Sequence, residues 1–136
     1  MSSEDYLLRQ LRQLGDFFAR LLGYQEKGEH DRILQEVDAA LDAWFQADVR
    51  SWDDRTEKKI QNLCSSATKN MEEEKVLAEL LYYRLKSMDA LGWRQQVKSL
   101  ANRLHEQYMD IDRRSGEYSF EMQQRIAEIR QLARKE

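Results

Sequence analysis

The sequence predicts an all-α protein of five to six antiparallel helices, and three observations support this fold class. The 136 residues contain no proline and only five glycines. Residues that lose little side-chain conformational entropy on entering a helix are abundant, namely Leu, Arg, Gln, Glu, Ala and Lys. Apolar residues recur at spacings of three and four, which is the helical period. A chain of this length can bury one sizeable core, so we expect a single all-helical domain over residues 1–136.

The first expected helix starts at a capping-box-like pair, Ser2 and Asp5, and ends within residues 23–28. Its apolar seam is formed by Leu7, Leu11, Leu14, Phe18 and Leu21. The second expected helix carries an apolar stripe, with three acids projecting on its opposite side. The stripe consists of Ile33, Leu34, Val37, Leu41, Trp44 and Phe45, and the three acids are Asp31, Asp38 and Asp42.

The remaining expected helices follow from start and stop signals along the chain. Ser51 and Asp54 start a weaker third helix, and Asn70 before an acidic triplet starts a fourth that Gly92 ends. A fifth helix begins directly after Gly92 and ends before the polar stretch DIDRRSGEYS. The sixth expected stripe consists of Phe120, Met122, Ile126, Ile129 and Leu132. Leu80 and Leu104 occupy the middle of the two longest stripes, so we expect both to be buried.

Two arrangements of these helices fit the sequence. Three segments, each behind a glycine, share a four-then-three apolar spacing: Ile33, Val37 and Ala40; Val97, Ala101 and Leu104; Met122, Ile126 and Ile129. This pattern resembles tetratricopeptide-type helical hairpins and implies a hairpin stack. No full 34-residue period is present, so a closed antiparallel bundle remains the alternative.

The opening stretch EDYLLRQLRQLGDFFARLL also resembles the amino-terminal signature of a family of short bacterial all-helical proteins of unknown function. The match covers about a seventh of the chain. The resemblance implies a bacterial all-helical protein and brings no activity with it.

Composition and charge exclude several classes of protein. The chain has 22 basic and 25 acidic residues, a net charge of −3, which argues against nucleic-acid binding. Its start lacks the features of a secretory signal, and no run is apolar enough to insert in a membrane. Cys64 is the single cysteine, so no disulfide can form within the chain. We therefore expect a soluble, cytoplasmic protein.

Catalytic and metal-binding patterns are missing from the sequence. His30 and His105 have no partner at metal-ligand spacing, and no phosphate loop, metalloprotease motif or serine elbow occurs. Asp110 and Asp112 suggest a calcium loop, but arginines follow where oxygen ligands should lie, which favours a turn. We expect no enzyme activity, no cofactor and no metal.

Charge is distributed unevenly along the chain. Residues 29–54 hold eight acids and two bases, whereas residues 55–70 hold four bases and one acid. Such an asymmetry can steer a partner or pair adjacent helices, and we favour the pairing of helices.

The apolar face of the first helix covers about half of its circumference, which is more than one neighbouring helix can bury. Helix six of the same chain, a second copy or another protein could cover the excess. A membrane-surface role is disfavoured, because the segment lacks a basic polar face. The expected interaction surface consists of Leu8, Arg12, Phe17 and Leu22.

The sequence thus predicts a protein–protein interaction or scaffolding module without catalysis. The alternative is a small regulatory ligand-binding bundle, which a pocket lined by Trp44, Trp93, Tyr82 or Tyr83 would favour.

Overall fold

The computed structural model describes the backbone of residues 3–45 and 71–135 and the side chains of residues 12–45 and 71–135. The described residues form five α-helices and no strand, which confirms the predicted fold class. The helices are α1 (Ser3–Glu26), α2 (His30–Phe45), α4 (Met71–Ala90), α5 (Arg94–Ser115) and α6 (Phe120–Arg134). The third expected helix lies outside the described residues. None of the described helices is long and apolar enough to span a membrane.

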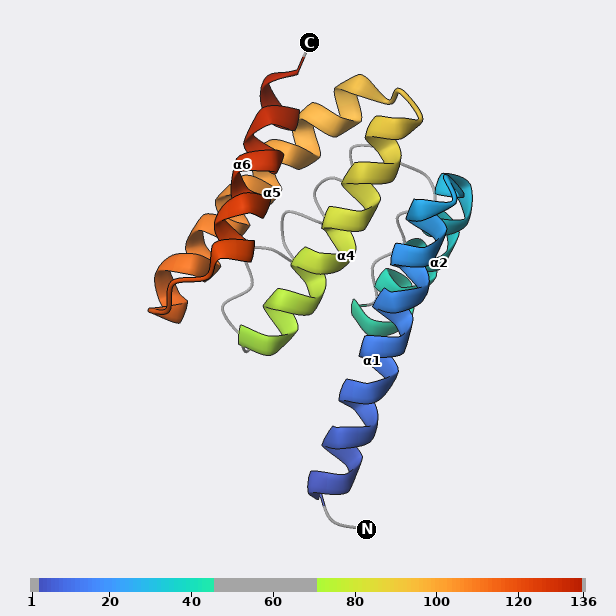
Figure 1. Cartoon of the computed structure of the whole chain (residues 1–136), viewed down its shortest axis with the longest axis vertical. Helices are drawn as coiled ribbons and strands as arrows, with labels where there is room; N and C mark the ends of the chain where they lie inside the picture. Colours follow the sequence, from blue (N-terminus) through green and yellow to red (C-terminus); the bar gives the residue numbers. More distant parts are fainter. Residues whose placement is uncertain (1–2, 46–70, 136) are drawn as a thin grey trace.

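The described helices form two layers (Figure 1). In the nearer layer α1, α4 and α6 lie side by side and run in the same direction, while α2 and α5 lie behind them and run in the opposite direction. The most extensive packing joins α1 to α2, α2 to α4, α4 to α5 and α5 to α6. Helices α1 and α6 therefore lie at opposite edges, and α6 does not close a bundle onto α1.

Helix α4 is the centre of the fold. Its polar and apolar residues are buried around most of its circumference, because helices of both layers pack against it. Leu80 and Leu104 are both fully buried at 0% exposure, so the prediction of a core at these positions is confirmed. The other fully buried large side chains are Leu21, Ile33, Leu41, Leu77, Leu81, Leu85, Met88, Leu100 and Ile111.

A glycine in the left-handed backbone conformation follows the end of α4 and of α5. Gly92, after α4, has a φ of +81°, and Gly116, after α5, has a φ of +67°. Residues with a Cβ atom rarely adopt this left-handed backbone conformation. The predicted stop at Gly92 is confirmed, and Ser119 caps α6 by accepting a hydrogen bond from the Met122 amide at 3.2 Å.

The predicted end of the fifth helix was wrong. Helix α5 continues through Asp110 and Asp112 to Ser115, where a turn was expected. Ile111 is fully buried, and Arg114 forms an ion pair with Asp110 one turn earlier, at 2.7 Å. Burial of Ile111 and the ion pair of Arg114 with Asp110 stabilise the helix through this stretch, although most of its residues are polar.

Several predicted stripe residues are exposed at helix ends. Trp44, at the end of α2, is 44% exposed, and Phe120, at the start of α6, is 63% exposed. Each belongs to the apolar stripe of its helix, but the described neighbouring helices cover these terminal turns only in part. Asp38 departs from its prediction in the opposite sense, because it is less exposed to solvent than expected. The sequence places it on the solvent side, yet it pairs with the buried guanidinium of Arg84 at 3.0 Å.

Candidate interaction surface

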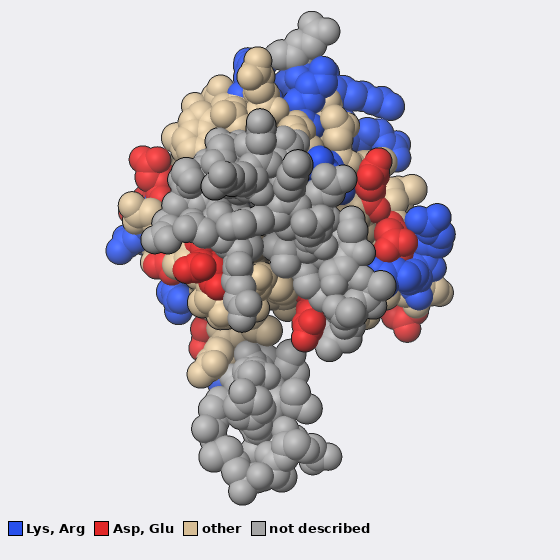
Figure 2. Space-filling view, turned by 180° about the vertical axis from the view of Figure 1, so that it is seen from behind, with Lys and Arg blue, Asp and Glu red and all other residues tan. Residues whose placement is uncertain are grey.

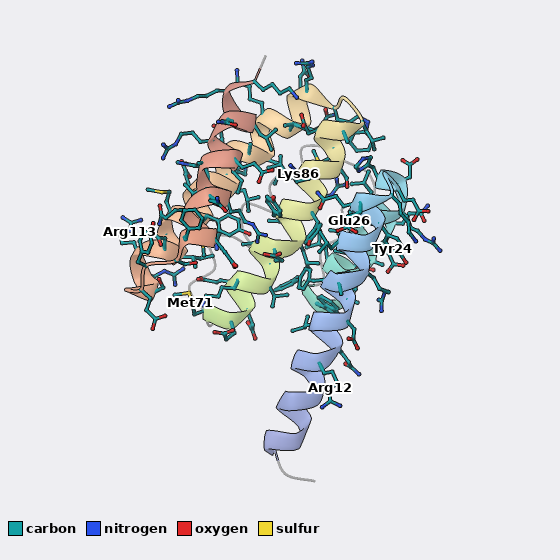
Figure 3. The ribbon with its side chains drawn as sticks, viewed as in Figure 1. Arg12, Tyr24, Glu26, Met71, Lys86 and Arg113 are labelled. Carbon is teal, nitrogen blue, oxygen red and sulfur yellow. The ribbon has the colours of Figure 1, made fainter. Side chains whose placement is uncertain are left out.

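Helix α1 projects beyond the rest of the described fold (Figure 1). It has 24 residues against 16 in α2, which corresponds to lengths of about 36 and 24 Å at 1.5 Å per residue. Its carboxy-terminal half packs on α2, whereas its amino-terminal half extends past the ends of the other helices. Arg12 lies on the projecting part (Figure 3).

The four residues of the predicted interaction surface have different positions. Arg12 is exposed, and Leu22 is 47% exposed despite its apolar side chain. The side chain of Leu8 lies outside the described residues. At 100° per residue, Leu8, Arg12 and Leu22 share one side of the helix. The structure therefore leaves the Leu22 side of α1 open.

Phe17 was wrongly predicted as part of this surface. It is only 7% exposed, and its ring contacts Trp44 of α2 edge-on, with centroids 5.1 Å apart. The adjacent Phe18 stacks on Tyr83 of α4 at 6.0 Å. The buried side of α1 is centred between Phe17 and Leu21, because α2 and α4 both lie there. It is rotated away from Leu22 relative to the predicted seam.

The aromatic residues that would favour a ligand-binding bundle do not line one pocket. Trp44 packs on Phe17, and Tyr83 packs on Phe18. Tyr82 donates a hydrogen bond to Glu128 at 2.7 Å, in a different part of the fold. Trp93 lines a groove between α2 and α5. Their separation favours packing roles for three of the four.

Histidine and carboxylate positions offer little for metal chemistry. In residues 12–45 and 71–135, no group of three or more His, Cys, Asp or Glu side chains could hold a metal ion. His105 lies beside Arg130, with Nε2 3.3 Å from the guanidinium Nε. His30 lies at the start of α2, far along the chain from His105.

A polar network between α4 and α6 was missed from the sequence. Residues of α4 at successive spacings of three, four and three face cations and a carboxylate in and directly after α6, and this spacing is the signal that could have revealed it. The pairs are Glu79 with Arg125, Tyr82 with Glu128, Lys86 with Glu128, and Asp89 with Lys135. The guanidinium of Arg125 also lies over the Tyr82 ring, 4.1 Å from its centroid. The network links the parallel helices α4 and α6 within one layer.

The pKa of Glu128 reflects this network. Partial burial by itself raises the pKa of the carboxyl, but hydrogen bonds from Lys86 and Tyr82 outweigh it, so the pKa lies below its ordinary value. Burial and the bond to Glu128 raise the pKa of the Tyr82 phenol, which keeps it protonated as a donor. A carboxyl with a lowered folded-state pKa stabilises the fold above its unfolded pKa. That stability is lost as pH falls through the folded pKa.

We expect Glu128→Gln to lower the free energy of unfolding at pH 7 by about 1 kcal/mol or less, since the pair is partly exposed to solvent. The difference from the wild type should shrink as the pH falls through the lowered pKa of Glu128, because the wild-type carboxyl then becomes protonated. Urea denaturation at several pH values measures it. Glu121→Gln, an exposed carboxyl of the same helix, is the control. A difference between Glu128→Gln and the wild type that stays constant with pH would contradict the assignment.

Basic side chains collect on the side of α5 and α6. Figure 2, the view from behind, shows Lys and Arg gathered most densely at the top and along the right edge, where these helices lie. Helix α2, in contrast, carries four acids and one base. Residues 55–70, the basic half of the predicted charge asymmetry, lie outside the described residues. The Asp38–Arg84 pair does join the acidic helix to its neighbour α4.

Comparison with protein-family models, curated proteins and solved structures finds no match to this chain. The resemblance of the opening stretch to short bacterial helical proteins therefore stays a prediction. The resemblance to tetratricopeptide-type hairpins stays one as well.

Proposed function

We propose that the chain is a non-catalytic protein–protein interaction or scaffolding module, and that α1 is its interacting element. The observations that support the proposal are the projection of α1 beyond the rest of the described fold and the exposure of Leu22 in the carboxy-terminal half of the same helix. Apolar residues left open on a projecting helix, with charged residues at their border, are typical of an interface. The partner is another protein or a second copy of the chain.

Other features of the chain suit this role. An open array of helices, as in tetratricopeptide-type stacks, presents more surface to partners than a closed bundle of equal length. A cytoplasmic location is part of this proposal, because a single cysteine suits a reducing compartment.

The double change Leu8→Glu and Leu22→Glu tests the proposal. We expect the helical circular dichroism to be retained, because Leu22 is exposed and does not belong to the core. Added carboxylates on this side of α1 should shift the mass in sedimentation toward the monomer, or abolish capture of the partner. Gln13→Glu, on the exposed polar side of α1, adds a carboxylate without touching the apolar side and should leave association unchanged.

Two results would defeat the proposal. One is a wild-type protein that is monomeric at high concentration and captures no partner. The other is a double variant that unfolds, which would show that these leucines belong to the core of the chain.

A further inference from the structure

A second surface, separate from α1, lies between α2 and the start of α5. It is a groove of about 840 Å³ with Arg84 of α4 at its floor. One wall is a stripe of α2, and the other is formed by Trp93 and Gln96. The described α2 residues of the groove are Asp31, Leu34, Gln35, Asp38, Ala39 and Asp42. None of them belongs to the predicted interaction surface on α1.

The described residues of the groove carry an excess of negative charge. Its basic side chain, Arg84, is 3% exposed and already pairs with Asp38. Asp31 and Asp42 are exposed, and neither forms an ion pair with another residue of the described chain. They are eleven positions apart on α2, which corresponds to about 16 Å at 1.5 Å per residue. Two open carboxylates thus stand at the two ends of one wall.

Trp93 provides an aromatic surface at the end of the groove. It is 39% exposed, and it lines the same groove as the carboxylates. The indole face is the strongest cation–π partner among the side chains. Leu34 and Ala39 add apolar surface along which the stem of a long basic side chain can lie. An indole beside carboxylates favours a guanidinium, which can stack on the ring and bind oxygens in pairs.

We propose that this groove binds an arginine-bearing peptide segment of a partner protein. An extended segment of about five residues spans the distance between Asp31 and Asp42, at roughly 3.3 Å per residue. Arginines near its ends pair with the two carboxylates, and one of them stacks on Trp93. The volume of the groove accommodates several side chains of such a segment. This binding goes beyond the association of α1 and does not depend on it.

A labelled eight-residue peptide of alternating arginine and serine serves as the probe, with full-length protein in 150 mM salt. Fluorescence anisotropy should show saturable binding. We expect Asp31→Asn with Asp42→Asn to weaken binding about tenfold, because two exposed ion pairs are lost. Trp93→Leu, which keeps an apolar side chain but removes the indole face, should weaken it several-fold. Circular dichroism checks that each variant is folded.

A matched control separates the groove from general attraction to an acidic protein. Glu106→Gln with Glu117→Gln removes the same charge from exposed positions on and after α5, outside the groove. This pair should leave the affinity within about twofold of the wild type. The proposal is overturned by a wild-type protein that does not bind the peptide, by equal weakening in the control pair, or by unchanged affinity in Trp93→Leu.

Discussion

Leu80→Ala and Leu104→Ala are each expected to lower the free energy of unfolding by about 2 to 5 kcal/mol. Both side chains are fully buried, one on the central helix α4 and one on α5. Removing three carbons from such a position loses the transfer free energy of these groups and leaves a cavity that the neighbours fill only in part. Urea denaturation followed by circular dichroism measures the loss.

Leu91→Ala is the matched control, because it makes the same chemical change at an exposed position outside the proposed interaction surface. It should alter the free energy of unfolding by about 0.5 kcal/mol or less, as ordinary surface changes do. A loss of less than about 1 kcal/mol at Leu80 or Leu104 would show that the described packing of α4 and α5 is wrong.

Arg84→Met is expected to cost about 3 to 5 kcal/mol, because it removes one partner of a buried ion pair. The carboxylate of Asp38 would remain in a site where its side chain is only 14% exposed. Burial lowers the pKa of the Arg84 guanidinium, while Asp38 acts in the opposite sense and favours its charged form. The two groups therefore depend on one another at the contact of α2 with α4.

The double variant Arg84→Met with Asp38→Leu tests this dependence. Replacing both charges by apolar groups leaves no unpaired carboxylate, so we expect most of the lost stability to return. A double-mutant cycle by chemical denaturation gives the coupling. Losses that simply add in the double variant would mean that the pair contributes nothing as a pair.

The parts of the fold that follow from local patterns were predictable from the sequence. The glycine stop at Gly92 and the stripes containing Leu80 and Leu104 depend on residues close together in the chain. Such signals act through backbone conformation and helical period, which a single sequence displays. They account for the fold class and for most helix positions.

Features that depend on the placement of distant helices were not predictable in the same way. Phe17 is buried because α2 and α4 both lie on its side of α1, and the period of α1 alone cannot choose between its two flanks. Asp38 looks solvent-facing until Arg84, 46 residues later, packs against it. The acidic groove likewise needs Trp93 to be brought beside α2. Contacts between residues this far apart in the sequence produce no pattern within a short stretch of the chain.

The packing of helices in chain order bears on how the chain reaches its fold. Contacts of α4 with α5 and of α5 with α6 close short loops, which cost little chain entropy. The contact of α2 with α4 must close across residues 46–70, which is slower. We therefore expect α4, α5 and α6 to assemble first, with the α1–α2 hairpin docking onto them afterwards. Opening in the folded protein should follow the reverse order, so that the α1–α2 hairpin separates first while α4, α5 and α6 stay packed together.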